Sequence, residues 1–136
     1  MILDGRNVVV ISPAASGKTE AVVAPAVERL LPECHDRFSI LYVSPTRALV
    51  NDLYRRLSEP LEYLQLALAR KTGDHPSIDE AKLPFMLITT PESFDSLLCR
   101  HTRIFKQLSA VILDELHLLD NTPRGTNCAC CSSGCG

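Results

Sequence analysis

The segment SPAASGKTEA, residues 12–21, places Gly17, Lys18 and Thr19 where a loop meets a helix. Backbone N–H groups at a helix N-terminus point toward a bound anion, and the helix dipole favours negative charge there. Glycine lets the backbone approach a phosphate, lysine can reach the β- and γ-phosphates of a nucleotide, and a threonine hydroxyl can coordinate Mg²⁺. The segment therefore predicts a phosphate-binding loop. The alternative is an ordinary helix N-terminus that is capped by Ser16 and carries a solvent-facing lysine.

A pair of acidic residues forms the second candidate group. The apolar run at residues 111–113 is followed directly by Asp114 and Glu115. One carboxylate at this place can hold Mg²⁺, and the other can orient or polarise an attacking water. Alone, the pair would suggest only a solvated turn, but together with the upstream loop it predicts a nucleotide site.

Strands and helices in alternation are expected to position these groups. Apolar runs predict strands at residues 8–11, 40–43, 64–69, 85–88 and 110–113. Apolar residues at helical spacing predict a helix at residues 18–31, a second that starts at residues 45–46 and has its apolar residues at 49, 53, 54 and 57, and a third from 91 to about 98. We expect Pro25 to kink the first helix or to shift its register.

The order of these elements favours an α/β domain with a mostly parallel sheet and right-handed crossovers. Ligands of such sheets bind at the carboxyl ends of the strands. Each polar motif follows the carboxyl end of a predicted strand. We therefore expect the candidate groups to meet at one edge of the sheet.

Charge and hydropathy exclude several classes of protein. The net charge is −2, so the chain would contact nucleic acid through a local surface rather than by bulk charge. No apolar run approaches the roughly 18 residues that span a bilayer. The sequence also shows no secretory signal, and we expect a cytoplasmic protein without a membrane partner.

The cysteines are unevenly distributed. Cys128, Cys130, Cys131 and Cys135 fall within the last nine residues, and their spacing fits no structural zinc site. A disulfide framework would need cysteines spread through the fold and an oxidising compartment. We expect residues 126–136 to form a disordered cysteine-rich tail, with an adventitious soft-metal site as the alternative.

Residues 114–117 have the sequence DELH, which is a DExH box. With the Gly-Lys-Thr segment, this box resembles the first RecA-like domain of superfamily 2 helicases. In matching order, SPTRALVNDL is similar to motif Ia, KTGD to a glycine-containing loop, and TTPES to motif Ib. Arg124 and Gly125 are similar to a pair in the Ski2-like and Lhr-like branch. The resemblance implies a partial helicase ATP-binding domain over residues 1–125. Its fold would be that of a P-loop NTPase, an incomplete RecA-like three-layer α/β sandwich with a mostly parallel sheet.

The resemblance also implies roles for individual residues. Those with a catalytic role would be Lys18, Asp114, Glu115 and His117, of which His117 couples the ATP site to a neighbouring domain. ATP would be bound by Ser12, Ala15, Ser16, Gly17, Lys18 and Thr19, and Mg²⁺ by Thr19 and Asp114. The backbone of a single-stranded tract of DNA or RNA would be contacted by Thr46, Arg47, Gly73 and Thr90. The two threonines could instead cap helices, and the arginine could be solvated or ion-paired.

The chain also departs from the family pattern. A Ser-Ala-Thr motif after the DExH box is absent, and no segment corresponds to the second RecA-like domain, which is an expected partner. Because ATP in this family lies between two such domains, we expect a helicase fragment with weak ATP binding and little hydrolysis of its own. The alternatives are a non-catalytic nucleotide-binding module or an inactive remnant. A small P-loop kinase is disfavoured, since it would not need motifs Ia and Ib.

Overall fold

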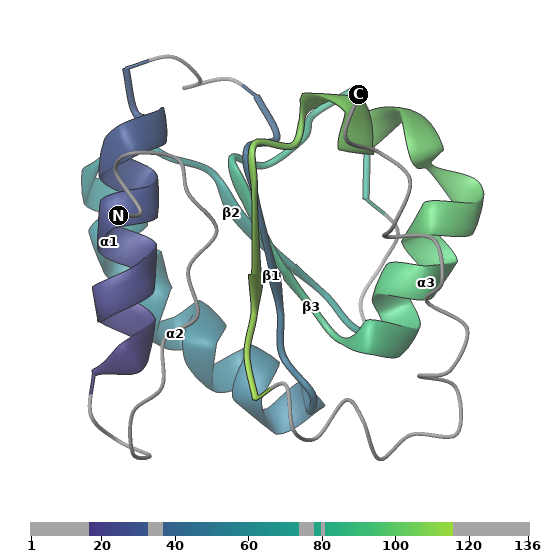
Figure 1. Cartoon of the computed structure of the whole chain (residues 1–136), viewed down its shortest axis with the longest axis horizontal. Helices are drawn as coiled ribbons and strands as arrows, with labels where there is room; N and C mark the ends of the chain where they lie inside the picture. The colour runs from purple at the N-terminus through teal and green to yellow at the C-terminus, as the bar shows by residue number, and fades with distance from the viewer. Residues whose placement is uncertain (1–16, 33–36, 74–77, 80, 116–136) are drawn as a thin grey trace, which may run out of the picture.

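The structure, a computed structural model, describes residues 17–32, 37–73, 78, 79 and 81–115. In this part of the chain four parallel strands form one sheet in the order β2-β3-β1-β4 (Figure 1). The strands are β1 (Ile40–Val43), β2 (Leu68–Lys71), β3 (Met86–Thr89) and β4 (Ala110–Leu113). The predicted parallel sheet is therefore confirmed. The predicted strand at residues 8–11 and the tail at residues 126–136 lie outside the described residues.

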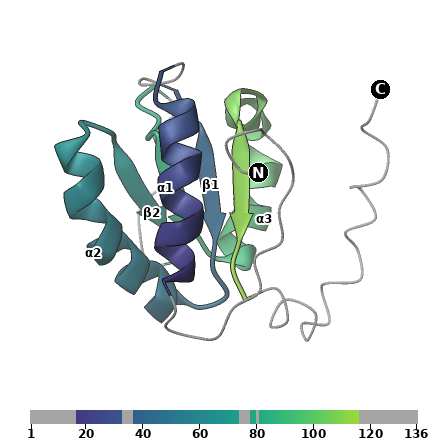
Figure 2. The same cartoon turned by 60° about the vertical axis from the view of Figure 1, so that its left-hand side comes forward.

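Helices cover both faces of this sheet (Figure 1; Figure 2). One face packs against α1 (Lys18–Leu30) and α2 (Arg47–Tyr63), and the other against α3 (Pro91–Arg100) and the 3₁₀ helix η1 (Thr102–Gln107). The chain runs from β1 through α2 to β2, and later from β3 through α3 in the opposite direction to β4. Right-handed crossovers that run in opposite directions lie on opposite faces, so this order produces the predicted three layers. None of these described helices has the length and apolar character that crossing a bilayer requires.

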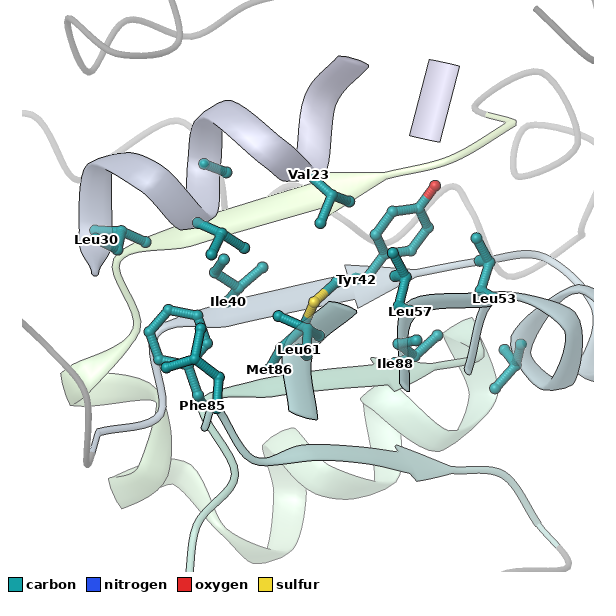
Figure 3. Close-up of a cluster of buried hydrophobic side chains, with 14 residues drawn as sticks. Val23, Leu30, Ile40, Tyr42, Leu53, Leu57, Leu61, Phe85, Met86 and Ile88 are labelled. Atoms are coloured by element: carbon teal, nitrogen blue, oxygen red, sulfur yellow. The ribbon is translucent and has the colours of Figure 1, made fainter. Parts of the chain in front are cut away.

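The central strands are buried on both faces. In β1, Ile40 and Tyr42 join the apolar cluster beneath α1 and α2 (Figure 3), whereas Leu41 and Val43 join the cluster beneath α3. This alternation is the ordinary pleat of a strand, and it explains why β1 is continuously apolar. Full burial of one such side chain contributes about 1.5–3 kcal/mol, so the two clusters are the main source of stability.

In the described structure β4 is partly buried on one face and exposed on the other. Ala110 and Ile112 pack against the cluster beneath α1 and α2, but Val111 and Leu113 are 51% and 48% exposed. The register places Val111 beside Leu41, on the sheet face that α3 covers elsewhere. None of the described helices covers this end of that face.

The first helix contains a proline and still remains one helix. Pro25 cannot donate a hydrogen bond to the Ala21 carbonyl, but α1 is unbroken from Lys18 to Leu30. An interior proline costs about 3 kcal/mol, which is less than the burial of several side chains contributes. The buried residues of α1 are Val23, Ala26, Val27 and Leu30. The packing of this face therefore holds the helix together through the proline.

The end of α2 differs from the sequence prediction. A strand is predicted from residue 64, but α2 continues to Tyr63 and β2 begins only at Leu68. The Leu66 N–H donates to the Leu61 carbonyl at 2.9 Å, and the Gln65 N–H donates to the Glu62 carbonyl at 2.9 Å. These two bonds form a Schellman cap. Leu64 and Leu66 therefore belong to the helix cap, and Leu66 is buried in the same cluster as Leu61. The last two residues of the predicted strand, Leu68 and Ala69, do lie in β2.

Gln65 has a φ of 58°, the left-handed conformation that this cap requires. Because a side chain makes that conformation unfavourable, Gln65→Gly is expected to raise the free energy of unfolding by about 0.5–1 kcal/mol. Urea denaturation of the two proteins would measure the difference. Gln65→Ala is the matched control and should give no such gain, since alanine keeps the Cβ atom. A Gly variant that is no more stable than the Ala variant would show that Gln65 is not strained.

Candidate functional site

The N-terminus of α1 has the geometry of an anion-binding turn. Gly17 is its N-cap and has a φ of 74° and a ψ of 22°, in the left-handed region. The nearest atom to a Cβ added there would be Glu20 Oε2 at 4.0 Å, so the backbone conformation rather than a lack of space favours glycine. The first turn then supplies Lys18, Thr19 and backbone N–H groups that have no acceptor within the helix. Other predicted site residues lie outside the described residues, namely Ser12, Ala15, Ser16 and His117.

The acidic pair meets this end of α1. The Asp114 N–H donates to the Val43 carbonyl at 2.9 Å and so continues the pairing of β1 with β4. Lys18 Nζ lies 3.8 Å from Glu115 Oε1, and each of the two side chains is 27% exposed. The fold thus brings together two charged groups that are far apart in the sequence.

Glu115 has an unusual backbone conformation. Its φ is 50°, a left-handed value that costs a residue with a side chain about 1 kcal/mol. The Glu115 N–H donates to Asp114 Oδ1 at 3.0 Å, which helps to hold this conformation. Such strain concentrates at functional sites, and it directs attention to Glu115.

Tyr42 connects the two halves of this site and was missed by the sequence predictions. Its hydroxyl donates to Asp114 Oδ2 at 3.0 Å, and the Thr19 hydroxyl also hydrogen-bonds to it. Burial, and after it the Asp114 carboxylate, raises the pKa of the Tyr42 phenol, which therefore stays protonated at neutral pH. The sequence feature that could have indicated Tyr42 is the alternation of side chains along a strand, which places residue 42 on the same sheet face as the first helix.

The oxygens at this point suit Mg²⁺. Thr19 and Asp114 both contact the Tyr42 hydroxyl, so a hydroxyl and a carboxylate lie close together. Among the residues that the structure describes, no group of three or more His, Cys, Asp or Glu side chains gathers around one point. In proteins Mg²⁺ keeps several waters and takes one or two carboxylates together with phosphate oxygens.

A second candidate site is a groove of about 610 Å³ at the carboxyl ends of β1, β2 and β3. It is lined by Pro45, Arg47, Lys71, Thr72, Gly73, Thr90, Glu92, Ser93 and Ser96. Two of these residues are cationic and one is anionic, and most of the others carry hydroxyls. Such a surface can hold phosphates without reading bases.

The residues predicted to contact nucleic acid do not all lie in this groove. Arg47, Gly73 and Thr90 line it, whereas Thr46 is not among the lining residues. Thr46 is the N-cap of α2, and its hydroxyl accepts a hydrogen bond from the Leu49 N–H at 3.3 Å. The Thr90 hydroxyl instead donates to Ser93 Oγ at 3.2 Å. The helix-capping alternative thus describes the first threonine but not the second.

Gly73 lies directly against the guanidinium group of Arg47. A Cβ added at Gly73 would lie 2.8 Å from Arg47 Nη2 and 3.5 Å from Arg47 Cζ. The first distance is shorter than van der Waals contact, so any side chain at residue 73 would displace the guanidinium. Lys71 and Ser93 were not predicted as site residues, although they belong to the same two sequence segments, KTGD and TTPES.

Comparison with known proteins agrees with this arrangement. Residues 1–133 match the DEAD/DEAH box helicase family. The chain is 35% identical to ATP-dependent helicase Lhr-Core protein 2 of Thermococcus barophilus, over 90% of this chain and 17% of the relative. It is 37% identical to ATP-dependent DNA helicase Hel308 of Thermococcus kodakarensis, over 91% of this chain and 11% of the relative. It is 34% identical to the Lhr helicase/uracil glycosylase of Escherichia coli, over 91% of this chain and 10% of the relative.

The chain thus spans between 10% and 17% of the length of these three relatives. The family match covers nearly all of the chain, and it includes both the helix end with Lys18 and the strand end with Asp114 and Glu115. The α/β fold with its parallel sheet is consistent with a RecA-like domain. The chain therefore belongs to the DEAD/DEAH box helicase family, and its relatives include the Lhr-Core and Hel308 helicases.

Proposed function

We propose that this chain is the ATP-binding RecA-like domain of an ATP-dependent helicase that acts on nucleic acid. The observation that carries the proposal is the 3.8 Å approach of Lys18 Nζ to Glu115 Oε1. This contact joins the helix N-terminus that can bind phosphate to the strand end that can assist hydrolysis. The family match and the names of the relatives support the same function.

ATP would bind at the N-terminus of α1. The contact between Lys18 and Glu115 is 3.8 Å long and partly exposed, and such a pair contributes about 0–1 kcal/mol. A charge-assisted hydrogen bond to phosphate contributes about 1.5–3 kcal/mol. When a nucleotide binds, Lys18 would therefore bind its phosphate in place of the Glu115 carboxylate. Gly17 and the first N–H groups of α1 would bind the phosphates. We assign the same task to Ser12, Ala15 and Ser16 from their positions in the loop.

Hydrolysis would use the acidic pair. Thr19 and Asp114 would hold Mg²⁺, which would neutralise charge on the β- and γ-phosphates when bound. Glu115, released by Lys18, would orient the attacking water and accept its proton. We propose from its place in the DExH box that His117 couples this site to a neighbouring domain.

Nucleic acid would lie in the groove at the ends of β1, β2 and β3. Arg47 and Lys71 supply positive charge, and Gly73 and Thr90 line the same groove. Contacts of this kind suit a single strand of DNA or RNA without regard to sequence. Thr46 would act indirectly, because its hydroxyl caps the helix that begins with Arg47.

Gly73→Ala tests this part of the proposal. The new methyl group would displace the Arg47 guanidinium, so affinity for a single strand is expected to fall about threefold to tenfold. Fluorescence anisotropy with labelled single-stranded DNA, single-stranded RNA and duplex DNA at fixed salt would measure the effect and the preference.

Two controls make this test specific. If Gly73→Ala acts through Arg47, then adding it to Arg47→Ala should cause little further loss. Arg29→Ala removes an exposed positive charge at the far end of α1 and should leave binding unchanged. Equal losses in Arg29→Ala and Gly73→Ala, or no binding of any strand by the folded chain, would contradict the proposed groove.

A further inference from the structure

The Tyr42 side chain has one end in the core and the other in the proposed nucleotide site. Its residue is only 2% exposed, and its ring belongs to the cluster beneath α1 and α2. Figure 3 shows the hydroxyl oxygen at the outer end of the ring, pointing away from the buried aliphatic side chains. A buried phenol needs hydrogen-bond partners, and here the partners are Asp114 and Thr19.

The direction of these hydrogen bonds follows from the single proton that a phenol carries. Tyr42 donates that proton to Asp114 Oδ2 at 3.0 Å, because a carboxylate can only accept. Toward Thr19 the phenol oxygen must then accept, so the Thr19 hydroxyl is the donor. Thr19 thus gives its proton to Tyr42, and the lone pairs of the Thr19 oxygen take no part in that hydrogen bond.

Asp114 is fixed on both of its carboxylate oxygens. Oδ2 accepts from Tyr42, and Oδ1 accepts from the Glu115 N–H at 3.0 Å. Each oxygen keeps further acceptor capacity, because an ionised carboxylate has about four lone-pair positions. Both Asp114 and Thr19 are thus held in place while their remaining lone pairs stay available to a cation.

We propose that Tyr42 is a positioning residue for the Mg²⁺ site, and that its hydroxyl sets the separation of the Thr19 hydroxyl and the Asp114 carboxylate. The inference deepens the proposed nucleotide site and rests on it. Tyr42 itself would not touch the nucleotide. Without its hydroxyl, Thr19 could donate directly to Asp114, and this new bond would occupy a carboxylate position and pull both groups away from the cation.

Tyr42→Phe tests the inference, because it keeps the buried ring and removes only the oxygen. The affinity of the chain for Mn²⁺ alone, measured by electron paramagnetic resonance, should fall about tenfold, as is typical when a residue that supports a metal ligand is lost. Calorimetry with ATP should show the same loss in Mg²⁺-dependent affinity. ATP affinity in EDTA should not change.

The control is Tyr54→Phe, which removes the hydroxyl of a partly buried tyrosine on α2 that packs against the same cluster. It should match the unsubstituted chain in Mn²⁺ affinity, in ATP affinity with Mg²⁺ and in ATP affinity in EDTA. The inference is overturned if Tyr42→Phe binds Mn²⁺ as tightly as the unsubstituted chain. It is also overturned if ATP affinity falls equally in EDTA and in Mg²⁺, since the hydroxyl would then support the fold in general.

The Mn²⁺ measurement separates this inference from the proposed function. If the unsubstituted chain bound no ATP but lost Mn²⁺ affinity through Tyr42→Phe, the proposed function would fail and the positioning role would stand. If the chain bound ATP with a Mg²⁺ dependence that Tyr42→Phe left unchanged, the positioning role would fail and the proposed function would stand.

Discussion

Replacing Lys18 by alanine is expected to lower the affinity of the chain for Mg·ATP about 10-fold to 100-fold. The ammonium group lies at the N-terminus of α1, 3.8 Å from the Glu115 carboxylate that a phosphate would displace. One charge-assisted hydrogen bond contributes about 1.5–3 kcal/mol, which corresponds to this range of affinity. Isothermal titration calorimetry of the folded variant would measure the change.

Lys106→Ala is the matched control for the Lys18 variant. Lys106 is an exposed lysine on η1, so its loss changes the net charge equally but leaves α1 and β4 untouched. It should bind Mg·ATP as the unsubstituted chain does. Unchanged affinity in Lys18→Ala, or an equal loss in both variants, would show that Lys18 is not a phosphate ligand.

Glu115→Gln is expected to separate binding from hydrolysis. Loss of the carboxylate that would accept a proton from water should reduce basal ATP hydrolysis by about 10²-fold or more. ATP affinity should stay the same or rise slightly, because the ion pair with Lys18 no longer competes with phosphate. Phosphate release under single-turnover conditions and calorimetry would measure the two quantities on one preparation.

Glu92→Gln controls for the loss of a negative charge. Glu92 is an exposed residue in the first turn of α3 and lines the groove rather than the nucleotide site. It should hydrolyse ATP at the rate of the unsubstituted chain. Hydrolysis by Glu115→Gln at that same rate would contradict the role assigned to Glu115.

Strands β1 and β3 could be predicted because burial on both faces of a parallel sheet leaves a continuous apolar run in the sequence. The apolar runs at residues 40–43 and 110–113 match β1 and β4, and the run at 85–88 is displaced by one residue from β3. The start of α3 was predictable for a different reason. Pro91 occupies its first turn, where the missing N–H has no cost.

The end of α2 could not be predicted in the same way. Leu64 and Leu66 are apolar and follow a helical segment, which is equally compatible with a new strand and with a helix cap. Only the hydrogen bonds to Leu61 and Glu62 and the positive φ of Gln65 distinguish the two. These depend on how the chain turns after the helix, and composition does not encode that turn.

The candidate site was predictable in its parts but not in its connections. Motif spacing indicated Lys18, Thr19, Asp114 and Glu115 as separate groups at strand ends. The bridge from Thr19 through Tyr42 to Asp114 depends on the register of β1 and β4 and on the packing of α1. A buried tyrosine in a strand carries no local sign of such a bridge, which is why tertiary structure was needed to find it.

The location of the nucleotide site is tested most directly by nuclear magnetic resonance of the ¹⁵N-labelled chain titrated with Mg·ATP. We predict saturable shifts that are largest for the amides of Gly17, Thr19 and Glu115, while Gly73 and Ser93 in the groove change little. The absence of saturable shifts in the folded chain would contradict this account. So would shifts that are largest in the groove and small at the N-terminus of α1 and the end of β4.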